Sequence, residues 1–214
     1  MAEASQLAER HWNETPLFLP EEERYKIYPW LYEAAEFRHH KGRKVLQVGC
    51  GTGSDLLQFA KHGAEAHGID ITDEHLRLAK ERVGSLATVQ RGDGRQIPYP
   101  SDYFDYVYSM IHHSDEPSKI VSEIMRVLKP SGRFNVQVYA KWLYFPVLLM
   151  LYHGAAWRNH IENSTAPVHI DLYTARSLRK LFPVQVEVTK HQGFPSEQFA
   201  RLWGWFLIAT GTKV

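Results

Sequence analysis

From residue 43 onward, the hydrophobic positions fall into two kinds of segment that alternate along the chain. Short apolar runs predict β-strands, and stretches with apolar residues three and four apart predict helices. The predicted strands cover residues 44–48, 64–69, 87–90, 103–109, 133–139, 184–189 and 205–210. The predicted helices cover residues 54–62, 73–82, 116–128 and 174–182. This alternation predicts an α/β fold: a doubly wound, mostly parallel seven-stranded sheet with helices on both faces.

Polar residues mark several boundaries of these elements. Asp73 and Thr174 are the predicted N-terminal caps of their helices, because their side-chain oxygens can accept backbone N–H groups. The sequence Lys-Pro-Ser-Gly at residues 129–132 predicts a turn that ends the preceding helix.

Two segments outside this alternation are rich in aromatic residues. Residues 21–40 are predicted to be helical with a break or kink near Pro29, and residues 141–159 form a second helical stretch. Because no linker separates these pieces, residues 1–214 are expected to form a single domain. Its expected parts are an N-terminal helical cover or lid (1–42), a ligand-binding core (43–140), a helical insertion on the substrate side (141–182) and C-terminal strands (183–214).

Composition and charge exclude several classes of protein. With 25 Lys+Arg against 24 Asp+Glu, the formal net charge is +1, so no overall field attracts nucleic acid. The apolar run at residues 142–152 is too short for a bilayer span of about 20 residues and is interrupted by Pro146, so no stable membrane insertion is expected. Residues 1–14 are polar without a signal-peptide core, and we expect a cytoplasmic protein. The single cysteine, Cys50, leaves no intramolecular disulfide or cysteine-cluster zinc site.

The sharpest chemical signal is a strand that runs into three glycines, Gly49, Gly51 and Gly53. Glycine permits tight turns and lets the backbone approach a ligand, and the next helix offers unpaired N–H groups at its start. Asp70 lies at the end of the following strand, where a carboxylate can accept hydrogen bonds from both hydroxyls of a ribose. The pattern indicates a dinucleotide or S-adenosylmethionine, with a βα turn that binds nothing as the alternative.

The spacing of the glycines distinguishes the two ligands. The dinucleotide pattern G-x-G-x-x-G requires glycine or alanine at position 54 or 56, where this chain has Ser54 and Leu56. S-adenosylmethionine has no pyrophosphate for such a loop to hold, so the G-x-G-x-G pattern favours it.

Four segments in this order resemble class I S-adenosylmethionine-dependent methyltransferases of the small-molecule, type 11 kind, which have a Rossmann-like fold. They are residues 45–53, 67–70, 91–113 and 123–136. The resemblance implies transfer of a methyl group from S-adenosylmethionine to a small-molecule acceptor by in-line displacement, with S-adenosylhomocysteine as the product. No nucleic-acid partner is implied, and no sequence pattern here specifies the oligomeric state.

The resemblance also implies roles for matching positions. Asp70 would hold the ribose hydroxyls, Ile71 would pack on the adenine and Asp93 would accept from its amino group. Ser109 and Met110 would lie near the sulfonium. The implied cofactor-binding residues are Gly49, Cys50, Gly51, Gly53, Asp70, Ile71, Asp93, Gly94, Ser109 and Met110.

Asp93, Cys50 and the neighbouring Gln47 need separate interpretation. Gln47 stands where the family usually has Asp or Glu, which removes a charge but keeps a hydrogen-bonding group. Asp93 between two glycines can instead close an Asx-type turn. Cys50 reads as a small buried apolar side chain rather than a nucleophile.

His112 and His113 follow the fourth predicted strand, which in this architecture faces the reacting methyl group. His112 is the candidate catalytic base, because a histidine there could take a proton from the acceptor; the alternative is that it only packs. The two histidines with Asp115 also suggest a metal site, but transfer from a sulfonium requires no metal and we predict none.

Aromatic and histidine side chains near the predicted substrate side are candidate acceptor contacts, although each one alone could equally pack in the core. The predicted substrate-binding residues are Trp12, Tyr25, Tyr28, His113, Tyr139 and Tyr144, and Trp30, Trp157 and His169 are further candidates. The segment 6–28 is a hypothetical lid over the cofactor, with a permanently docked helix as the alternative.

Two other functions stay open at this point. An NAD-dependent oxidoreductase shares the fold class, although Ser54 and the Asp93 loop disfavour it. A non-catalytic S-adenosylmethionine-binding protein is the second, which Gln47 keeps open.

Overall fold

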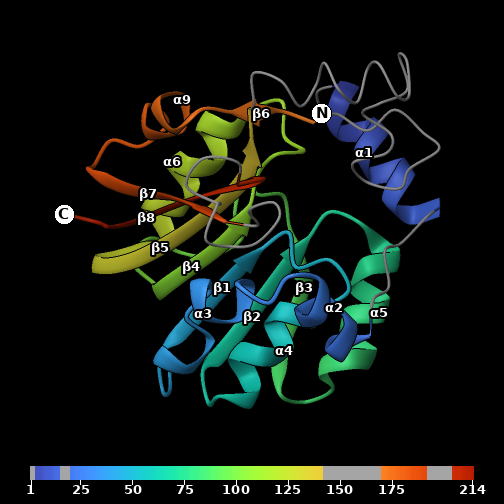
Figure 1. Cartoon of the computed structure of the whole chain (residues 1–214). Helices are drawn as coiled ribbons and strands as arrows, with labels where there is room; N and C mark the ends of the chain where they lie inside the picture. Colours follow the sequence, from blue (N-terminus) through green and yellow to red (C-terminus); the bar gives the residue numbers. More distant parts are fainter. Residues whose placement is uncertain (1–2, 15–19, 142–169, 192–203) are drawn as a thin grey trace.

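The computed structural model describes residues 3–14, 20–141, 170–191 and 204–214, and its centre is one twisted sheet (Figure 1). The strand order is β3-β2-β1-β4-β5-β8-β7, with the short β6 beside β5. The strands are β1 Lys44–Val48, β2 Glu65–Asp70, β3 Ala87–Arg91, β4 Phe104–Met110, β5 Leu128–Ala140, β6 Leu172–Tyr173, β7 Val186–His191 and β8 Phe206–Thr212. Strand β8 runs antiparallel to its neighbours β5 and β7, and the other strand pairs are parallel. The predicted doubly wound, mostly parallel sheet is confirmed, with β6 as an eighth strand of two residues.

The helices cover both faces of this sheet (Figure 1). They are α1 Glu3–Glu14, α2 Glu21–Ile27, α3 Leu31–Ala34, η1 Phe37–His39, α4 Ser54–Lys61, α5 Asp73–Val83, α6 Pro117–Val127 and α9 Ala175–Arg179. Alternation along β1 explains the two layers: Leu46 packs in a core with residues of α6 and α9, whereas Val45 packs in a second core with residues of α3, α4 and α5. We call residues 20–40, which lie on the second face with α2, α3 and η1, the N-terminal cover.

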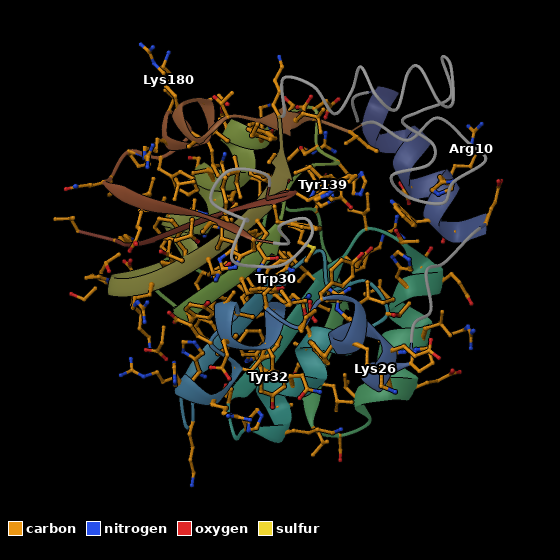
Figure 2. The ribbon with its side chains drawn as sticks, viewed as in Figure 1. Arg10, Lys26, Trp30, Tyr32, Tyr139 and Lys180 are labelled. Atoms are coloured by element: carbon orange, nitrogen blue, oxygen red, sulfur yellow. The ribbon has the colours of Figure 1, made fainter. Side chains whose placement is uncertain are left out.

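The order of the strands reverses between β1 and β4, because the chain winds from β1 to β3 in one direction and from β4 to β5 in the other. Loops after the carboxyl ends of neighbouring strands diverge at such a point and leave a crevice, where open α/β sheets bind ligands. Side chains gather above this region: Trp30 and Tyr139 lie toward the middle of the molecule, whereas Arg10, Lys26 and Lys180 point outward (Figure 2).

Three local expectations need correction. The N-terminal cap of α5 is Thr72, with extended backbone, and Asp73 is the first helical residue. Residues 129–132 belong to β5 and are not a separate turn, although the β4–β5 register jumps there from Phe104 opposite Leu128 to Tyr106 opposite Arg133. The helix expected over residues 21–40 is divided into α2, α3 and η1, so the break near Pro29 is only one of two.

The predicted cap of the last helix is confirmed. The Thr174 hydroxyl accepts the backbone N–H of Ser177 at 3.0 Å, and the Ser177 hydroxyl accepts the backbone N–H of Thr174. The helix expected over residues 141–159 lies outside the described residues apart from residue 141. None of the helices in the described ranges combines the length and apolar character needed to cross a membrane.

Candidate active site

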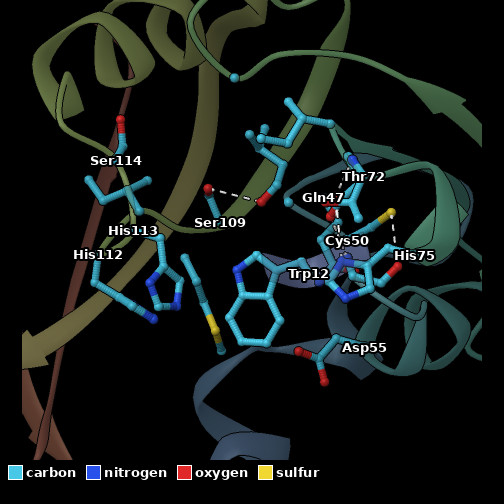
Figure 3. A pocket seen from close by; sticks show the side chains of 18 of the residues that line it. Trp12, Gln47, Cys50, Asp55, Thr72, His75, Ser109, His112, His113 and Ser114 are labelled. Atoms are coloured by element: carbon cyan, nitrogen blue, oxygen red, sulfur yellow. Dashed lines mark hydrogen bonds and ion pairs between the residues drawn. The ribbon is translucent and has the colours of Figure 1, made fainter. Parts of the chain in front are cut away.

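A cavity of about 310 Å³ lies at the crevice between β1 and β4 (Figure 3). Its floor consists of loops that follow the carboxyl ends of strands: residues 49–52 after β1, 70–72 at the end of β2, 92–95 after β3 and 109–114 from β4 onward. Residues of α1, the N-terminal cover and β8 also line it. Its volume falls at the lower end of the range for small-molecule sites, about 300–1,000 Å³.

The loop after β1 takes a shape that glycine favours. Gly49 and Gly51 have positive φ angles of 71° and 51°, in the region where side chains with a Cβ are strained. The carbonyl of Ile69 accepts the N–H groups of Gly49 and Cys50, both at 2.9 Å, which fastens the loop to β2. Gly53 does not line the cavity; a Cβ there would lie 3.2 Å from Ala79, so this glycine lets α4 approach α5.

Asp70 links this loop to the next one. Its Oδ2 accepts the N–H of Gly51 at 2.8 Å, and its Oδ1 accepts the N–H of Thr72 at 2.9 Å. Burial opposes ionisation of Asp70, but His75, with Nδ1 3.6 Å from Oδ1, and the two N–H groups outweigh it and lower the pKa. Asp70 is therefore a buried carboxylate whose oxygens lie at the cavity floor, as a ribose partner requires.

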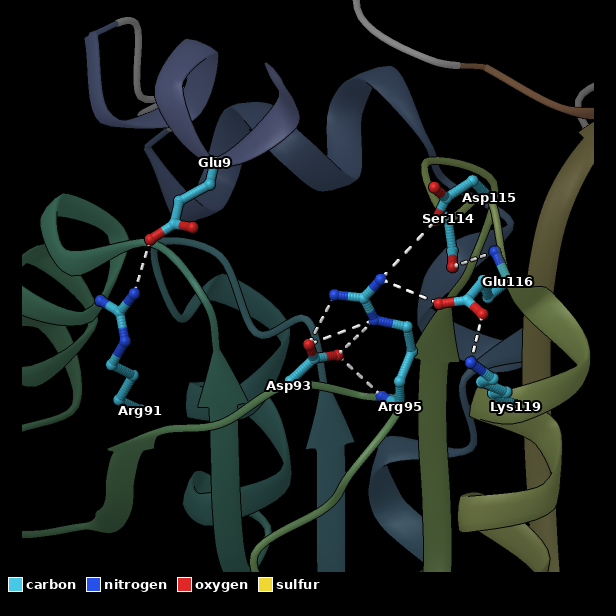
Figure 4. Close-up of polar contacts among 8 residues, drawn as sticks. All are labelled: Glu9, Arg91, Asp93, Arg95, Ser114, Asp115, Glu116 and Lys119. Carbon is cyan, nitrogen blue, oxygen red and sulfur yellow. Dashed lines mark hydrogen bonds and ion pairs between the residues drawn. The ribbon is translucent and has the colours of Figure 1, made fainter. Parts of the chain in front are cut away.

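Asp93 has an arginine partner in the same loop (Figure 4). Its Oδ1 accepts the backbone N–H of Arg95 at 2.8 Å, the Asx-type turn foreseen as the alternative, and the Arg95 guanidinium also donates to both carboxylate oxygens. Arg95 extends on to Glu116, at 3.1 Å, after β4. Burial raises and Arg95 lowers the pKa of Asp93, and the balance is a lowered pKa.

A buried ion pair lies where the N-terminal cover meets α4. Arg24 donates to both oxygens of Asp55 at 2.8 Å, and the hydroxyls of Tyr25 and Tyr108 donate to the same carboxylate at 2.9 and 3.1 Å. Asp55 is 2% exposed. Burial favours its neutral form, yet Arg24 and the two hydroxyls lower its pKa. Tyr25 thus contacts Asp55 and does not line the cavity, unlike Tyr28.

The end of β4 supplies the other side of the cavity. The Ser109 hydroxyl donates to the carbonyl of Val48 at 3.1 Å, which ties β4 to β1 at the glycine loop. The ring of His112 lies 4.2 Å from that of Tyr139, between centroids. Burial, with a smaller effect of His113, lowers the pKa of His112 far below its usual 6.5 despite a hydrogen bond to the backbone of Gln137. His112 is therefore neutral at physiological pH.

Trp12 brings α1 to the cavity. Its ring centroid lies 5.7 Å from that of His75 and 5.6 Å from that of His113, so it spans the two sides of the crevice (Figure 3). Glu9 on the same helix pairs with Arg91 at 2.5 Å (Figure 4).

The residues present fit S-adenosylmethionine. Gln47 is 5% exposed, lines the cavity, and its Oε1 is buried without a hydrogen-bond partner in the described part of the chain. Buried acceptors are normally satisfied, so this oxygen suits a ligand donor such as an ammonium group. The open space at Gly51, where a Cβ would meet no atom within 4 Å, and the Asp70 carboxylate add room and a hydroxyl acceptor.

The cavity brings together most of the residues singled out in the sequence. Gly49, Cys50, Gly51, Asp70, Ile71, Asp93, Gly94, Ser109, Met110, His112, Trp12, Tyr28, His113 and Tyr139 all line it. Tyr144 lies outside the described residues. The sequence reasoning missed Asp55, His75, Arg95 and Phe206. The partners of Asp55 and Phe206 are distant in sequence, whereas His75 and Arg95 have nearby partners in Asp70 and Asp93 but belong to no motif position. Among described residues, no cluster of three or more His, Cys, Asp or Glu side chains could hold a metal ion.

The strand order, the glycine loop and the carboxylate at the end of β2 define a doubly wound α/β protein with a nucleotide-type ligand site. A family model described as a methyltransferase domain matches residues 46–136. A demethylmenaquinone methyltransferase of Symbiobacterium thermophilum is 31% identical over 210 residues, which cover 86% of this chain and 82% of that protein. The chain thus belongs to the class I S-adenosylmethionine-dependent methyltransferases.

Other relatives share the domain over shorter stretches. Methyltransferase GfsG of Streptomyces halstedii is 36% identical over 115 residues, half of this chain but only 40% of GfsG. The structure of YcgJ from Bacillus subtilis has a TM-score of 0.59 and 26% identity, covering 75% of this chain and 69% of YcgJ. A possible histamine N-methyltransferase of Thermotoga maritima, at 17% identity and TM-score 0.68, covers 99% of this chain and all of its own, and shares the fold.

Replacing Asp55 by Asn should destabilise the protein by about 3–5 kcal/mol, because it leaves the Arg24 guanidinium buried without a counter-charge. Since the pKa of Asp55 is lowered, its contribution is present above its ordinary pKa of 3.8 and is lost as the pH falls below it. Urea unfolding should therefore give a difference between parent and variant that is constant near neutral pH and shrinks in acid. The control Asp102→Asn removes an exposed pair with Lys213 and should cost about 1 kcal/mol or less. An equal cost for both variants would contradict this.

The imidazole of His112 should not titrate around its ordinary pKa of 6.5, because burial disfavours its charged form and lowers the pKa. NMR of protein labelled at histidine ring carbons measures this, with His112→Asn used to assign the resonance. A titration midpoint near the ordinary 6.5 would show instead a solvent-accessible ring able to act as an efficient base.

Proposed function

We propose that this protein transfers the methyl group of S-adenosylmethionine to a small-molecule acceptor. The observation that carries the proposal is the cavity floor, where the glycine loop, the Asp70 carboxylate and the unpartnered Oε1 of Gln47 meet. The three groups suit the methionine backbone, the ribose hydroxyls and the ligand ammonium, which are separate parts of one molecule.

In this proposal, the cofactor-binding residues are Gly49, Cys50, Gly51, Asp70, Ile71, Asp93, Gly94, Ser109 and Met110, with Gly53 acting through helix packing. Asp70 keeps its bond to Gly51 and offers its remaining lone pairs to the ribose. Asp93 can accept from the adenine amino group while it stays paired to Arg95, because a carboxylate has about four acceptor sites.

When bound, S-adenosylmethionine supplies an activated methyl group: the acceptor atom forms a bond to the methyl carbon, the carbon–sulfur bond breaks, and its electron pair stays on sulfur. The protein's task is then to hold the two molecules in line and to exclude water, and such positioning can supply about 7–11 kcal/mol of the barrier. A site of this kind consists mainly of binding residues.

His112 as general base stays a prediction. Its neutral imidazole can receive a proton from the acceptor, but its lowered pKa makes it a weak base, so the contribution expected from proton transfer is at the low end. The ring contact with Tyr139 suits a second role, in which His112 shapes the acceptor side of the cavity.

The choice of a small-molecule acceptor is supported by the substrates after which several relatives are named. They include demethylmenaquinone methyltransferases and sterol 24-C-methyltransferases, whose named substrates are small molecules. The near-neutral net charge of +1 gives no reason to expect nucleic acid as the acceptor. Neither an oxidoreductase nor a cofactor-binding protein without activity is favoured by any relative named above.

We also propose that α1 is a mobile lid over the cavity, whereas the N-terminal cover of residues 20–40 is fixed. α2 is fastened by the buried pair of Arg24 and Asp55. In contrast, α1 is held by Glu9 on Arg91, a residue half exposed, and by Asn13 accepting the N–H of Glu74 at 3.2 Å. Exposed pairs contribute little to stability, so α1 with Trp12 can act as the lid while α2 and α3 stay docked.

The binding test is calorimetry with S-adenosylhomocysteine. Asp70→Ala should weaken the affinity about 10–150-fold, because a hydrogen bond to a charged group is worth about 1.5–3 kcal/mol. The matched control Asp73→Ala, three residues further on at the start of α5, replaces an exposed carboxylate paired with Arg91 and should leave the affinity unchanged. Equal affinities in a folded Asp70 variant would remove Asp70 from the site, and tighter binding of NAD by the parent would refute the function. Release of S-adenosylhomocysteine with a panel of acceptors then tests the activity itself.

The lid is tested by hydrogen exchange with and without S-adenosylhomocysteine. Exchange over residues 3–14 should slow when the nucleotide binds, whereas residues 21–34 should be slow in both states. Arg91→Ala should speed exchange of α1 in the free protein, and the control Arg77→Ala, which removes only pairs with Glu74 and Glu81, should not. Ligand-independent protection of α1 would identify it as fixed structure.

A further inference from the structure

The side of the cavity formed by the N-terminal cover, β5 and β8 is lined by aromatic rings. Tyr28 ends α2, Trp30 precedes α3, Tyr139 lies near the end of β5 and Phe206 begins β8. We call these four residues the aromatic wall; all of them line the cavity. The centroid of Phe206 lies 4.9 Å from that of Tyr139, 5.2 Å from that of Trp30 and 5.8 Å from that of Tyr28.

Strand register explains how the wall is assembled. Phe206 stands opposite Tyr139 on β5 and opposite His191 on β7, so the three side chains share one face of the sheet. His191 stacks on the indole of Trp30, with centroids 4.9 Å apart and planes inclined by 24°. The sheet therefore provides one half of the wall, and the N-terminal cover provides the other.

Trp30 adds a polar group to this apolar surface. Its Nε1 is shielded from solvent and has no hydrogen-bond partner within the described ranges. Indole N–H is a donor only, and buried donors in native proteins are almost always paired. Because Trp30 lines the cavity, an acceptor atom of a ligand held there is one source of the missing partner.

Aromatic faces attract both flat rings and cations, and the orphan donor distinguishes the two. An N–H group points positive charge at its partner, which repels a cation and attracts an oxygen lone pair. Asp55 of α4, a carboxylate that lines the cavity and binds the N-terminal cover, is already neutralised by Arg24 and offers a cation no free counter-charge.

We propose that the aromatic wall is the acceptor subsite, that it binds a planar aromatic ring bearing a hydroxyl or carbonyl oxygen, and that Trp30 Nε1–H donates to that oxygen. This rests on the proposed function, because it puts the acceptor in the same cavity as the cofactor. Trp30 then determines specificity, because it holds the acceptor ring by its oxygen while the methyl group is transferred to another edge of that ring.

Three bicyclic probes of similar size test the chemistry. Equilibrium dialysis against protein saturated with S-adenosylhomocysteine compares 2-naphthol, naphthalene and decahydro-2-naphthol, which have ring and hydroxyl, ring alone, and hydroxyl alone. Binding of 2-naphthol should be about tenfold tighter than binding of either analogue, since both ring contacts and the hydrogen bond contribute. A fourth probe, the 2-naphthyl trimethylammonium cation, should bind more weakly than 2-naphthol.

Trp30→Phe keeps an aromatic ring and removes the N–H group. It should weaken binding of 2-naphthol about 3–10-fold more than binding of naphthalene, because only 2-naphthol loses a hydrogen bond. The control Tyr32→Phe removes a hydroxyl that contacts His62 at 2.5 Å on a residue that does not line the cavity, and it should change neither.

Equal binding of 2-naphthol and decahydro-2-naphthol, tighter binding of the cation, or unchanged 2-naphthol binding in a folded Trp30→Phe variant would each overturn the proposal. Failure of the parent protein to bind S-adenosylhomocysteine would refute the proposed function instead. In that case the probe series is run without the nucleotide, and its order still decides for or against the aromatic subsite.

Discussion

The carboxylate of Asp55 is the group on which the shape of the cavity depends. It is buried at the start of α4, one residue after the glycine loop has ended, and it receives the Arg24 guanidinium and the hydroxyls of Tyr25 and Tyr108. Arg24 and Tyr25 come from the N-terminal cover and Tyr108 from the centre of β4. A single charged group therefore connects the cover, the first helix after the loop and the central sheet. Because breaking one partner of a buried pair is far costlier than breaking an exposed one, this connection fixes where the cover lies.

The two ends of the cavity are built on different principles. At the end next to β1 and β2, the backbone forms the lining: glycines at positive φ, N–H groups on Asp70, and the carbonyl of Ile69. At the aromatic wall, side chains form it, and they come from elements as far apart in sequence as Tyr28 and Phe206. The glycine loop requires particular residue types at fixed spacings in the sequence. The aromatic wall requires only that large aromatic side chains lie close together in the fold.

This difference explains how much could be predicted from the sequence. Apolar runs and helical spacing predicted all seven strands on the main path of the sheet, and the glycines with Asp70 predicted the loop that contacts it. The Arg24–Asp55 pair could not be predicted, because periodicity carries no information on a contact between residues 31 positions apart. The cap of α5 lies at Thr72, one residue before the predicted Asp73, and the N–H of Thr72 is bound by the carboxylate of Asp70.

The same division bears on how one fold serves several activities. A chain described as the [4+2]-cyclase SpnF shares this fold, with TM-score 0.62 and 20% identity over 86% of the present chain. The strand order and the switch point are properties of the backbone, and they set where a ligand binds but not which reaction follows. In this protein, the N-terminal cover is held at the switch point by the buried pair of Arg24 and Asp55 and by core packing of Leu31 and Phe37, and its Tyr28 and Trp30 line the cavity. Replacing Tyr28 or Trp30 while Asp55 stays paired would change the cover's half of the aromatic wall, and the glycine loop would keep its hydrogen bond to Asp70, in which neither ring takes part.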